Sequence, residues 1–143
     1  MQGQGHPGRM ETYEKALAAF ADGTNYVQDN IERVEIPYGE GKKLSGLLTL
    51  AEGEGPRPLV VFCNGLDSCK EMLWLGGFPY ALAKRGISCL CVDQPGTGEA
   101  LRLEELPATY ASEEWASAWV DWLVEQAFVD PQRIGMTGIS LGV

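Results

Sequence analysis

The sequence predicts an α/β fold, in which helices cover both faces of a largely parallel sheet. Two observations carry this prediction. Residues 59–63 are continuously apolar and residues 87–92 are apolar apart from Ser88, as in strands that are covered on both faces, and a helical segment connects them. A second helical segment and a third strand follow, so the order after an initial pair of strands is β-α-β-α-β.

An amphipathic helix is expected near the N-terminus. Residues 1–9 are rich in glycine and glutamine and predict a disordered tail. In residues 10–23 the side chains of Tyr13, Leu17 and Phe20 recur at i, i+4 and i+7, which places them on one face of a helix that a glycine at position 23 would end. This face needs another element to pack against.

Two strands that form an antiparallel hairpin are expected next. Val34 and Ile36 alternate with polar residues in residues 31–37, and residues 44–50 form the second run. A Gly-Glu-Gly turn at 39–41 separates the two runs. The hairpin then leads through a loop into the first of the two apolar strands.

The segment between the two apolar strands predicts an interrupted crossover helix. Residues 69–85 have helical character, but Gly76, Gly77 and Pro79 break the pattern. Gly86 ends the segment immediately before the second apolar strand. The three elements form a β-α-β unit.

After the second apolar strand, a further helix is expected at residues 112–126. Ser112 is a plausible N-cap, and acidic residues follow it in the first turn. Three tryptophans recur at helical spacing, a pattern that is typical of a core-facing stripe. Residues 129–133 are expected to be a loop. The tryptophans are Trp115, Trp119 and Trp122.

A G-x-S-x-G pattern follows the last expected strand. Residues 134–137 predict this strand, and residues 138–142 carry the pattern. Where a strand turns sharply into a helix around a serine, side chains at Gly138 and Gly142 would clash with neighbouring backbone. Such a turn makes Ser140 a candidate nucleophile at the C-terminal edge of the sheet.

Two other turns would complete a site around this serine. The backbone N–H of Leu141 follows Ser140 directly, and the N–H of Leu66 follows an Asn-Gly pair at 64–65, just after the first apolar strand. Both N–H groups are candidates for stabilising an oxyanion. Residues 93–98 have the pattern Asp-x-Pro-Gly-x-Gly, and we expect this turn to shape the loop beside the site.

These motifs resemble the α/β-hydrolase family. Within it, residues 64–71 and 93–100 are similar to the subfamily that includes the fermentation-respiration switch esterase and 2,6-dihydroxypseudooxynicotine hydrolase. The resemblance covers residues 31–143 and implies an incomplete α/β-hydrolase core domain, in which an antiparallel hairpin precedes a parallel β-α-β-α-β unit. Residues 10–23 resemble the end of the subfamily's helical lid.

The resemblance also implies a site and a reaction. Ser140 would be the nucleophile, and the N–H groups of Leu66 and Leu141 would form the oxyanion hole. Members hydrolyse an ester or a C–C bond next to a ketone through an acyl-enzyme, without a cofactor or a metal. The residues of this chain do not choose between the two reactions.

The rest of a catalytic triad is not found in the chain. In this fold an acid and a histidine follow the serine in chain order. Only three residues follow Ser140, and the single histidine, His6, precedes the whole fold. A serine hydroxyl needs such a base to become a good nucleophile. We therefore expect an N-terminal fragment of a larger enzyme that is inactive alone.

Composition and charge exclude several classes of function. The 143 residues include 11 Lys+Arg and 20 Asp+Glu, a formal net charge of -9, so a nucleic-acid backbone or an anionic membrane would repel the chain. The apolar runs are far shorter than the roughly 20 residues of a membrane-spanning helix, and the N-terminus lacks the apolar part of a secretory signal. We expect a cytoplasmic protein whose partner is a small acyl or diketone-type molecule; the oligomeric state stays open.

Two groups of side chains could suggest a metal site, but a simpler interpretation is preferred for each. The cysteines at positions 63, 89 and 91 lie in predicted buried strands, where free thiols are more common than ligands. Several acidic residues lie between the second apolar strand and the helix expected at 112–126, or at the start of that helix. They are expected to form a solvated surface. These residues are Glu99, Glu104, Glu105, Glu113 and Glu114.

Two other functional classes compete with the hydrolase. Residues 137–142 also fit the start of the glycine-rich turn of short-chain dehydrogenases, which holds a dinucleotide at a helix N-terminus. That turn normally follows the first strand of its domain, whereas a whole β-α-β-α unit precedes this one. A non-catalytic protein that keeps the fold is the other alternative, because fold does not fix function.

Overall fold

Five strands form one mixed sheet, with helices on both of its faces. The computed structural model describes residues 7–26 and 30–142. The strands lie in the order β1-β2-β4-β3-β5. Their bounds are β1 Ile31–Tyr38, β2 Lys42–Thr49, β3 Arg57–Cys63, β4 Ser88–Val92 and β5 Val129–Gly138; the helices are α1 Arg9–Thr24, α2 Lys70–Leu75, α3 Phe78–Ala83, α4 Gly98–Arg102 and α5 Ser112–Val124.

The strand pairing confirms the predicted hairpin and parallel unit. β1 and β2 pair in antiparallel register, with Ile31 opposite Thr49. β2 also pairs with β4 in antiparallel register, whereas β3 pairs in parallel with β4 and β5. β3 therefore lies between two parallel neighbours, and its C-terminal end at Cys63 lies level with Gly138, the last residue of β5.

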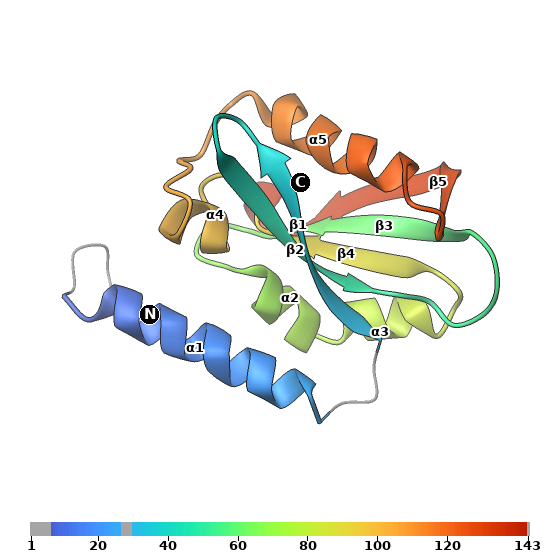
Figure 1. The fold of residues 1–143 in the computed structure, drawn as a ribbon, viewed down its shortest axis with the longest axis horizontal. Coiled ribbons are helices and arrows are strands. Elements are labelled where there is room, and N and C mark those ends of the chain that lie inside the picture. The colour runs from blue at the N-terminus through green and yellow to red at the C-terminus, as the bar shows by residue number, and fades with distance from the viewer. Residues whose placement is uncertain (1–6, 27–29, 143) are drawn as a thin grey trace.

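Each face of the sheet packs against a different set of helices. α5 covers one face, while α2 and α3 lie on the other (Figure 1). Trp115 and Trp119 of α5 are buried in the larger hydrophobic cluster with the strands, and Trp122 is partly buried against it. The prediction that these tryptophans form a core-facing stripe is confirmed. On the other face, Leu73 and Phe62 belong to the smaller cluster.

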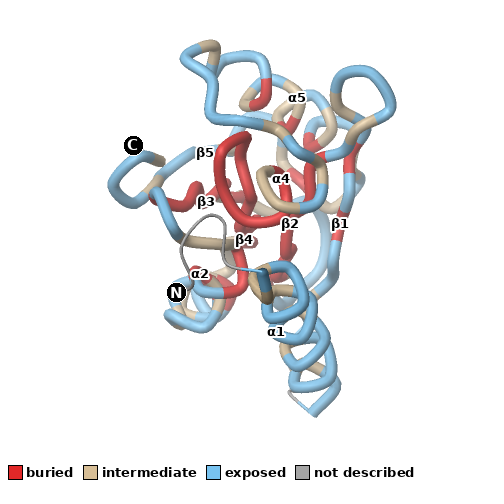
Figure 2. Tube along the Cα trace, turned by 90° about the vertical axis from the view of Figure 1, so that its left-hand side faces the viewer, coloured by how far each residue is buried: buried red, intermediate tan, exposed pale blue. Residues whose placement is uncertain are grey.

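α1 packs on the outside of the α2 face. Tyr13, Leu17 and Phe20 are half-buried, as their spacing predicted, and no described residue of α1 is fully buried. Figure 2 shows the buried residues concentrated in the central strands, away from α1. The ring of Phe20 packs edge-on against Trp74 of α2, with 5.5 Å between the ring centroids.

Several elements before α5 differ from those predicted. α1 begins at Arg9, inside the predicted tail, and continues past Gly23 to Thr24; residues 1–6 of that tail lie outside the described residues. The crossover segment forms two short helices, because Gly77 takes a φ of +78° between them. Residues 98–102, for which no helix was predicted, form α4.

The segments that flank α5 also differ from the prediction. Ser112 is the first helical residue rather than the N-cap, which is Ala111 and carries no capping side chain. Residues 129–133 were predicted to be a loop but belong to β5. This prediction was wrong because the pairing with β3 begins early: Arg57 lies opposite Val129, and an irregularity separates this pair from the next.

The cysteines are free thiols, as predicted. Cys63, Cys89 and Cys91 are buried, and Cys69 is half-buried. Burial raises the pKa of the Cys63 thiol to about 12, which keeps it protonated and unreactive at neutral pH. No helix in the described part of the chain has the length and apolar character needed to cross a membrane.

Candidate active site

The chain reverses sharply at the C-terminal end of β5. β5 ends at Gly138, and Ser140 begins a short 3₁₀ turn, η1, that spans Ser140–Gly142. Ser140 has a φ of +56°, in the left-handed region that non-glycine residues rarely adopt. Backbone strain of this kind costs about 1–3 kcal/mol and persists only where the surroundings enforce it.

The two glycines of the G-x-S-x-G pattern leave no space for a side chain. A Cβ atom at Gly138 would overlap the backbone carbonyl of Gly142. A Cβ at Gly142 would lie 2.7 Å from the backbone oxygen of Cys63 and 2.8 Å from that of Asn64. The steric reason that the sequence suggested for both glycines agrees with this close packing against the end of β3.

The loop after β3 lies directly beside the serine. A Cβ at Gly65 would lie 3.2 Å from the Cβ of Ser140 and 3.8 Å from its Oγ. The Ile139 N–H donates to the Cys63 carbonyl oxygen over 3.2 Å, which ties the two turns together. The structure thus brings the neighbours of Leu66 and Leu141 to one place at the sheet edge.

Both candidate oxyanion donors belong to exposed residues. Leu66 is 66% exposed and Leu141 is 54% exposed. Among the described residues, no backbone carbonyl accepts a hydrogen bond from the N–H of Leu66 or of Leu141. An oxyanion hole requires N–H groups that are free of such bonds.

A buried carboxylate organises the loops behind the serine turn. Asp93, directly after β4, is fully buried and accepts hydrogen bonds from the Asn64 side-chain amide at 2.7 Å, the Lys70 backbone N–H at 2.8 Å and the Glu99 backbone N–H at 2.9 Å. The prediction that the turn at 93–98 shapes the neighbouring loop agrees with these contacts. Asp93 joins the end of β3, the start of α2 and the start of α4.

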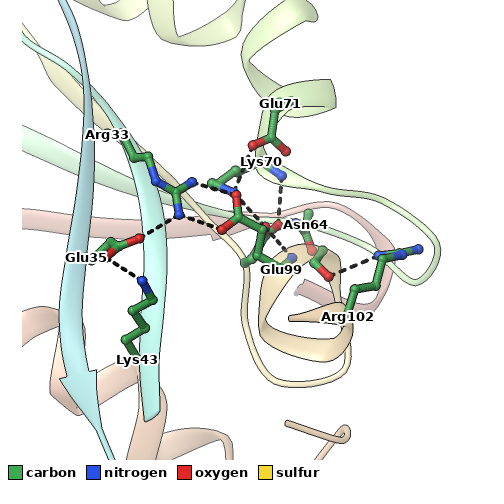
Figure 3. Close-up of polar contacts among 10 residues, drawn as sticks. Arg33, Glu35, Lys43, Asn64, Lys70, Glu71, Glu99 and Arg102 are labelled. Atoms are coloured by element: carbon green, nitrogen blue, oxygen red, sulfur yellow. Dashed lines mark hydrogen bonds and ion pairs between the residues drawn. The ribbon is translucent and has the colours of Figure 1, made fainter. Parts of the chain in front are cut away.

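Lys70 lies at the centre of this cluster and is completely buried. Its Nζ lies 2.6 Å from Glu99 Oε1, 2.8 Å from Glu71 Oε1 and 3.0 Å from Asp93 Oδ2 (Figure 3). Burial disfavours the ammonium, but the attraction of the three carboxylates outweighs it and raises the pKa of Lys70. The lysine is therefore a permanently charged structural group at neutral pH.

Glu99 does not lie on a solvated surface, so that prediction was wrong. It is 3% exposed and accepts two hydrogen bonds from the Arg33 guanidinium, at 2.5 and 2.6 Å, as well as the bond from Lys70. Burial raises the pKa of this carboxyl, but the bonds from Arg33 and Lys70 outweigh burial and lower it to about 2. Glu105, Glu113 and Glu114 are exposed, as predicted.

Sequence reasoning missed this cluster. Its members are separated by up to 66 residues, so no local spacing links them. The available signal was their position: Asp93 and Asn64 are polar residues that directly follow buried parallel strands. Among the described residues, no group of three or more His, Cys, Asp or Glu side chains could hold a metal ion, and His6 lies outside those residues.

A cavity of about 770 Å³ opens between α1 and the loops beside the site. Its wall is mainly apolar and includes Leu17 and Phe20 of α1, Leu66 after β3, and Leu101 of α4. Leu66 belongs to both the cavity wall and the loop beside Ser140. The cavity therefore borders this loop, although Ser140 itself is not among its lining residues.

The topology and the serine turn define the class of protein. A G-x-S-x-G turn at the end of a parallel strand that follows two crossovers is the arrangement of α/β-hydrolases. The solved structure of 2,6-dihydroxy-pseudo-oxynicotine hydrolase superimposes with a TM-score of 0.82 at 27% identity, over 94% of this chain and 37% of that chain. The chain has an α/β-hydrolase fold.

The sequence relatives identify the family. A family model described as Esterase FrsA-like matches residues 11–143. Esterase FrsA of Vibrio cholerae serotype O1 is 34% identical over 112 residues, which are 78% of this chain and 26% of the relative. Alpha/beta hydrolase gkaG of Penicillium citrinum is 30% identical over 139 residues, 90% of this chain and 32% of the relative. The chain belongs to the FrsA-like esterase family.

This membership confirms the resemblance seen in the sequence and bears on the alternatives. The residues at 137–142, which could have begun a dinucleotide-binding turn, instead span the end of β5 and the turn η1 of an α/β-hydrolase fold. The chain spans 26% and 32% of the length of the two curated relatives. The substrate of a complete protein of this family is therefore proposed rather than established.

Proposed function

We propose that the chain carries the nucleophile and the oxyanion hole of a serine hydrolase. The observation that supports this most is the backbone of Ser140, whose φ of +56° is held between two glycines packed against the end of β3. A protein without catalytic need of the serine has no reason to keep this strain. The available N–H groups of Leu66 and Leu141 support the same role.

In the proposed reaction, Ser140 Oγ attacks the carbonyl carbon of the substrate while a base takes its proton. The carbonyl oxygen becomes an oxyanion that accepts hydrogen bonds from the N–H groups of Leu66 and Leu141. Collapse of this intermediate expels the leaving group, which takes up a proton, and leaves an acyl-Ser140 ester. Water then attacks the acyl-enzyme by the same route and releases the acid.

The general base and its acid would come from residues other than those of this chain. Histidine is the usual base, and the single histidine here, His6, precedes α1 in the sequence. We infer that the 143 residues alone do not turn over an ester, because an unassisted serine hydroxyl is a weak nucleophile. A purified 143-residue chain that hydrolyses esters with multiple turnovers would contradict this inference.

The substrate is proposed to be a small molecule with an ester, or a C–C bond next to a ketone. Both reactions pass through the same acyl-enzyme; the leaving group is an alkoxide in the first and a stabilised carbanion in the second. The mainly apolar cavity between α1 and Leu66 supports an apolar substrate portion. We infer that α1 is the end of a lid and so supplies one wall of this cavity.

The experiment that tests this proposal is the hydrolysis of p-nitrophenyl esters by the full-length gene product. We expect S140A to lower kcat on the order of 10⁶-fold, because the nucleophile is lost. S112A is the matched control, since Ser112 is exposed at the start of α5 and makes no capping bond. Unchanged hydrolysis in S140A would contradict the proposal.

A further inference from the structure

The backbone of Asn64 is held in both directions by one side chain. Gln94 Nε2 donates to the Asn64 carbonyl oxygen at 2.6 Å, and Gln94 Oε1 accepts from the Asn64 N–H at 3.2 Å. Gln94 is 4% exposed, so the pair of bonds is shielded from water. The amide of Gln94 thus mimics a neighbouring peptide group in a sheet.

This pair of bonds lies where the sheet itself stops. The last residues of β3 and β4 that lie opposite each other are Cys63 and Val92. Asn64 is the next residue after Cys63, and Gln94 follows Val92 with only Asp93 between them. The side chain of Gln94 therefore supplies the hydrogen bonds that a continued β4 would have made, one residue before the chain turns at Gly65.

The held carbonyl also lies against the serine turn. A Cβ at Gly142 would be 2.8 Å from the Asn64 carbonyl oxygen, so the two backbones are in close contact. Gly142 directly follows Leu141, and Leu66 lies two residues after Asn64. A shift of the Asn64 peptide would therefore change the separation between the two candidate oxyanion donors.

The rest of the loop is anchored independently. Asp93 binds the Asn64 side chain at 2.7 Å and the Lys70 backbone N–H at 2.8 Å, which secures the two ends of the loop 64–70. Within this frame, the contacts of Gln94 act on the Asn64 peptide itself. Among the described residues, Gln94 is the one whose side chain bonds both the N–H and the carbonyl of Asn64.

We propose that Gln94 is a positioning residue of the oxyanion hole, which acts through the Asn64 peptide to place the Leu66 N–H opposite that of Leu141. This inference rests on the proposed function of Ser140 and adds a specific element to it. Gln94 touches no reacting atom; it fixes where a donor lies. A donor misplaced by about 1 Å can cost about 10²-fold in rate.

The test compares Q94M with the wild type in the full-length gene product. Methionine has nearly the same length and shape but makes neither hydrogen bond. We expect kcat for a p-nitrophenyl ester to fall about 10- to 100-fold with little change in KM, because an oxyanion interaction acts on the transition state. Affinity for a trifluoromethyl ketone, which forms an oxyanion on the serine, should fall in parallel.

Q126L and Q94L complete the design. Gln126 donates its side-chain amide to the Trp122 carbonyl at 3.0 Å, at the far end of α5, so Q126L removes a similar bond away from the site. We expect Q126L to keep the wild-type kcat and ketone affinity. Q94L replaces Q94M if the latter does not fold. Wild-type kcat and ketone affinity in a folded Gln94 variant would overturn the inference.

A second readout separates this inference from the proposed function. Amide hydrogen exchange of the peptide that contains Asn64 and Leu66 should be faster in Q94M than in the wild type, and unchanged in Q126L. If an organophosphate does not modify Ser140 in the wild type, the proposed function fails, whereas the exchange data still decide whether Gln94 holds the loop. Equal exchange in Q94M and the wild type would overturn the inference.

Discussion

The strained backbone at Ser140 is enforced by close contacts of backbone with backbone. Gly142 lies against the carbonyls of Cys63 and Asn64, and Gly138 lies against Gly142. These contacts leave no flexible side chain that could move aside. The position of the Ser140 hydroxyl is therefore set by the end of β3 as much as by its own turn.

A methyl group at the second glycine should disrupt this contact. In G142A the new Cβ would lie 2.7 Å from the Cys63 carbonyl oxygen, so one of the two backbones must move. Overpacking of this kind costs about 1–3 kcal/mol. We expect chemical denaturation to show a loss of free energy of unfolding in that range, together with a large loss of ester hydrolysis by the full-length gene product.

G135A, in the strand that leads into the serine turn, is the control for this prediction. A Cβ at Gly135 meets nothing within 4 Å and its φ is not positive. We expect G135A to keep both its stability and its activity. If G142A behaved like G135A, the close packing of the serine turn on β3 would not hold.

The ionic cluster behind the serine turn should make the free energy of unfolding depend on pH in the acid range. The pKa of Glu99 is about 2 in the folded protein, below the ordinary value of 4.5. A lowered folded-state pKa stabilises the fold above pH 4.5, and the contribution is lost as the pH falls towards 2. Because Glu99 is buried, we expect the fold to lose about 3 kcal/mol of stability across this range, since a tenfold change in an acid dissociation constant corresponds to about 1.4 kcal/mol.

The E99Q variant tests this acid dependence. Its free energy of unfolding should change less than that of the wild type between about pH 5 and pH 2, although E99Q is less stable at neutral pH because Lys70 and Arg33 lose a charged partner. E113Q changes an exposed glutamate of α5 and should follow the wild type. Parallel pH curves for wild type and E99Q would show that Glu99 carries no such contribution.

At the scale of elements, the features that sequence could predict are those with a local cause. The strands at 59–63 and 87–92 are apolar except at Ser88 because both of their faces are covered, and the tryptophans of α5 recur at helical spacing because one side of the helix faces the sheet. Each pattern can be recognised from residues that lie close together in the sequence. These elements were predicted correctly for that reason.

The elements that sequence missed depend on distant partners. α4 is only five residues long, and its Glu99 N–H is bonded by Asp93, which follows a different element. The start of β5 at Val129 depends on its pairing with Arg57 of β3. For the same reason the site was predicted only in its turns, at Ser140, Leu66 and Leu141, and not in the buried ion pairs of Lys70.

α5 should depend on Trp119 for its attachment to the sheet. This side chain is fully buried, and its ring packs edge-on against that of Trp122, with 6.0 Å between the centroids. We expect W119A to cost about 3–5 kcal/mol in the free energy of unfolding, because a large cavity forms between helix and sheet.

V124A on the same helix is the comparison for W119A. Val124 is 45% exposed, so its truncation removes little buried surface, and we expect a change of less than about 1 kcal/mol. Urea denaturation followed by circular dichroism measures both values. A similar cost for the two variants would contradict the position of α5 on the sheet.

At the scale of the whole molecule, the described residues carry the proposed nucleophile and the two proposed oxyanion donors. The sheet edge presents Ser140 and two available N–H groups, and the buried cluster of Lys70, Asp93 and Glu99 orders the loops behind them. The cavity beside α1 adds space for a substrate. The chain spans 37% of the solved hydrolase that it superimposes on.

The most direct test of the proposed nucleophile is covalent labelling of the full-length gene product with a fluorophosphonate, followed by peptide mass spectrometry. We predict a single stoichiometric adduct on the peptide that contains Ser140, lost in S140A and retained in S112A. An adduct on another residue, or ester hydrolysis without any adduct at Ser140, would contradict the assignment of Ser140 as the nucleophile.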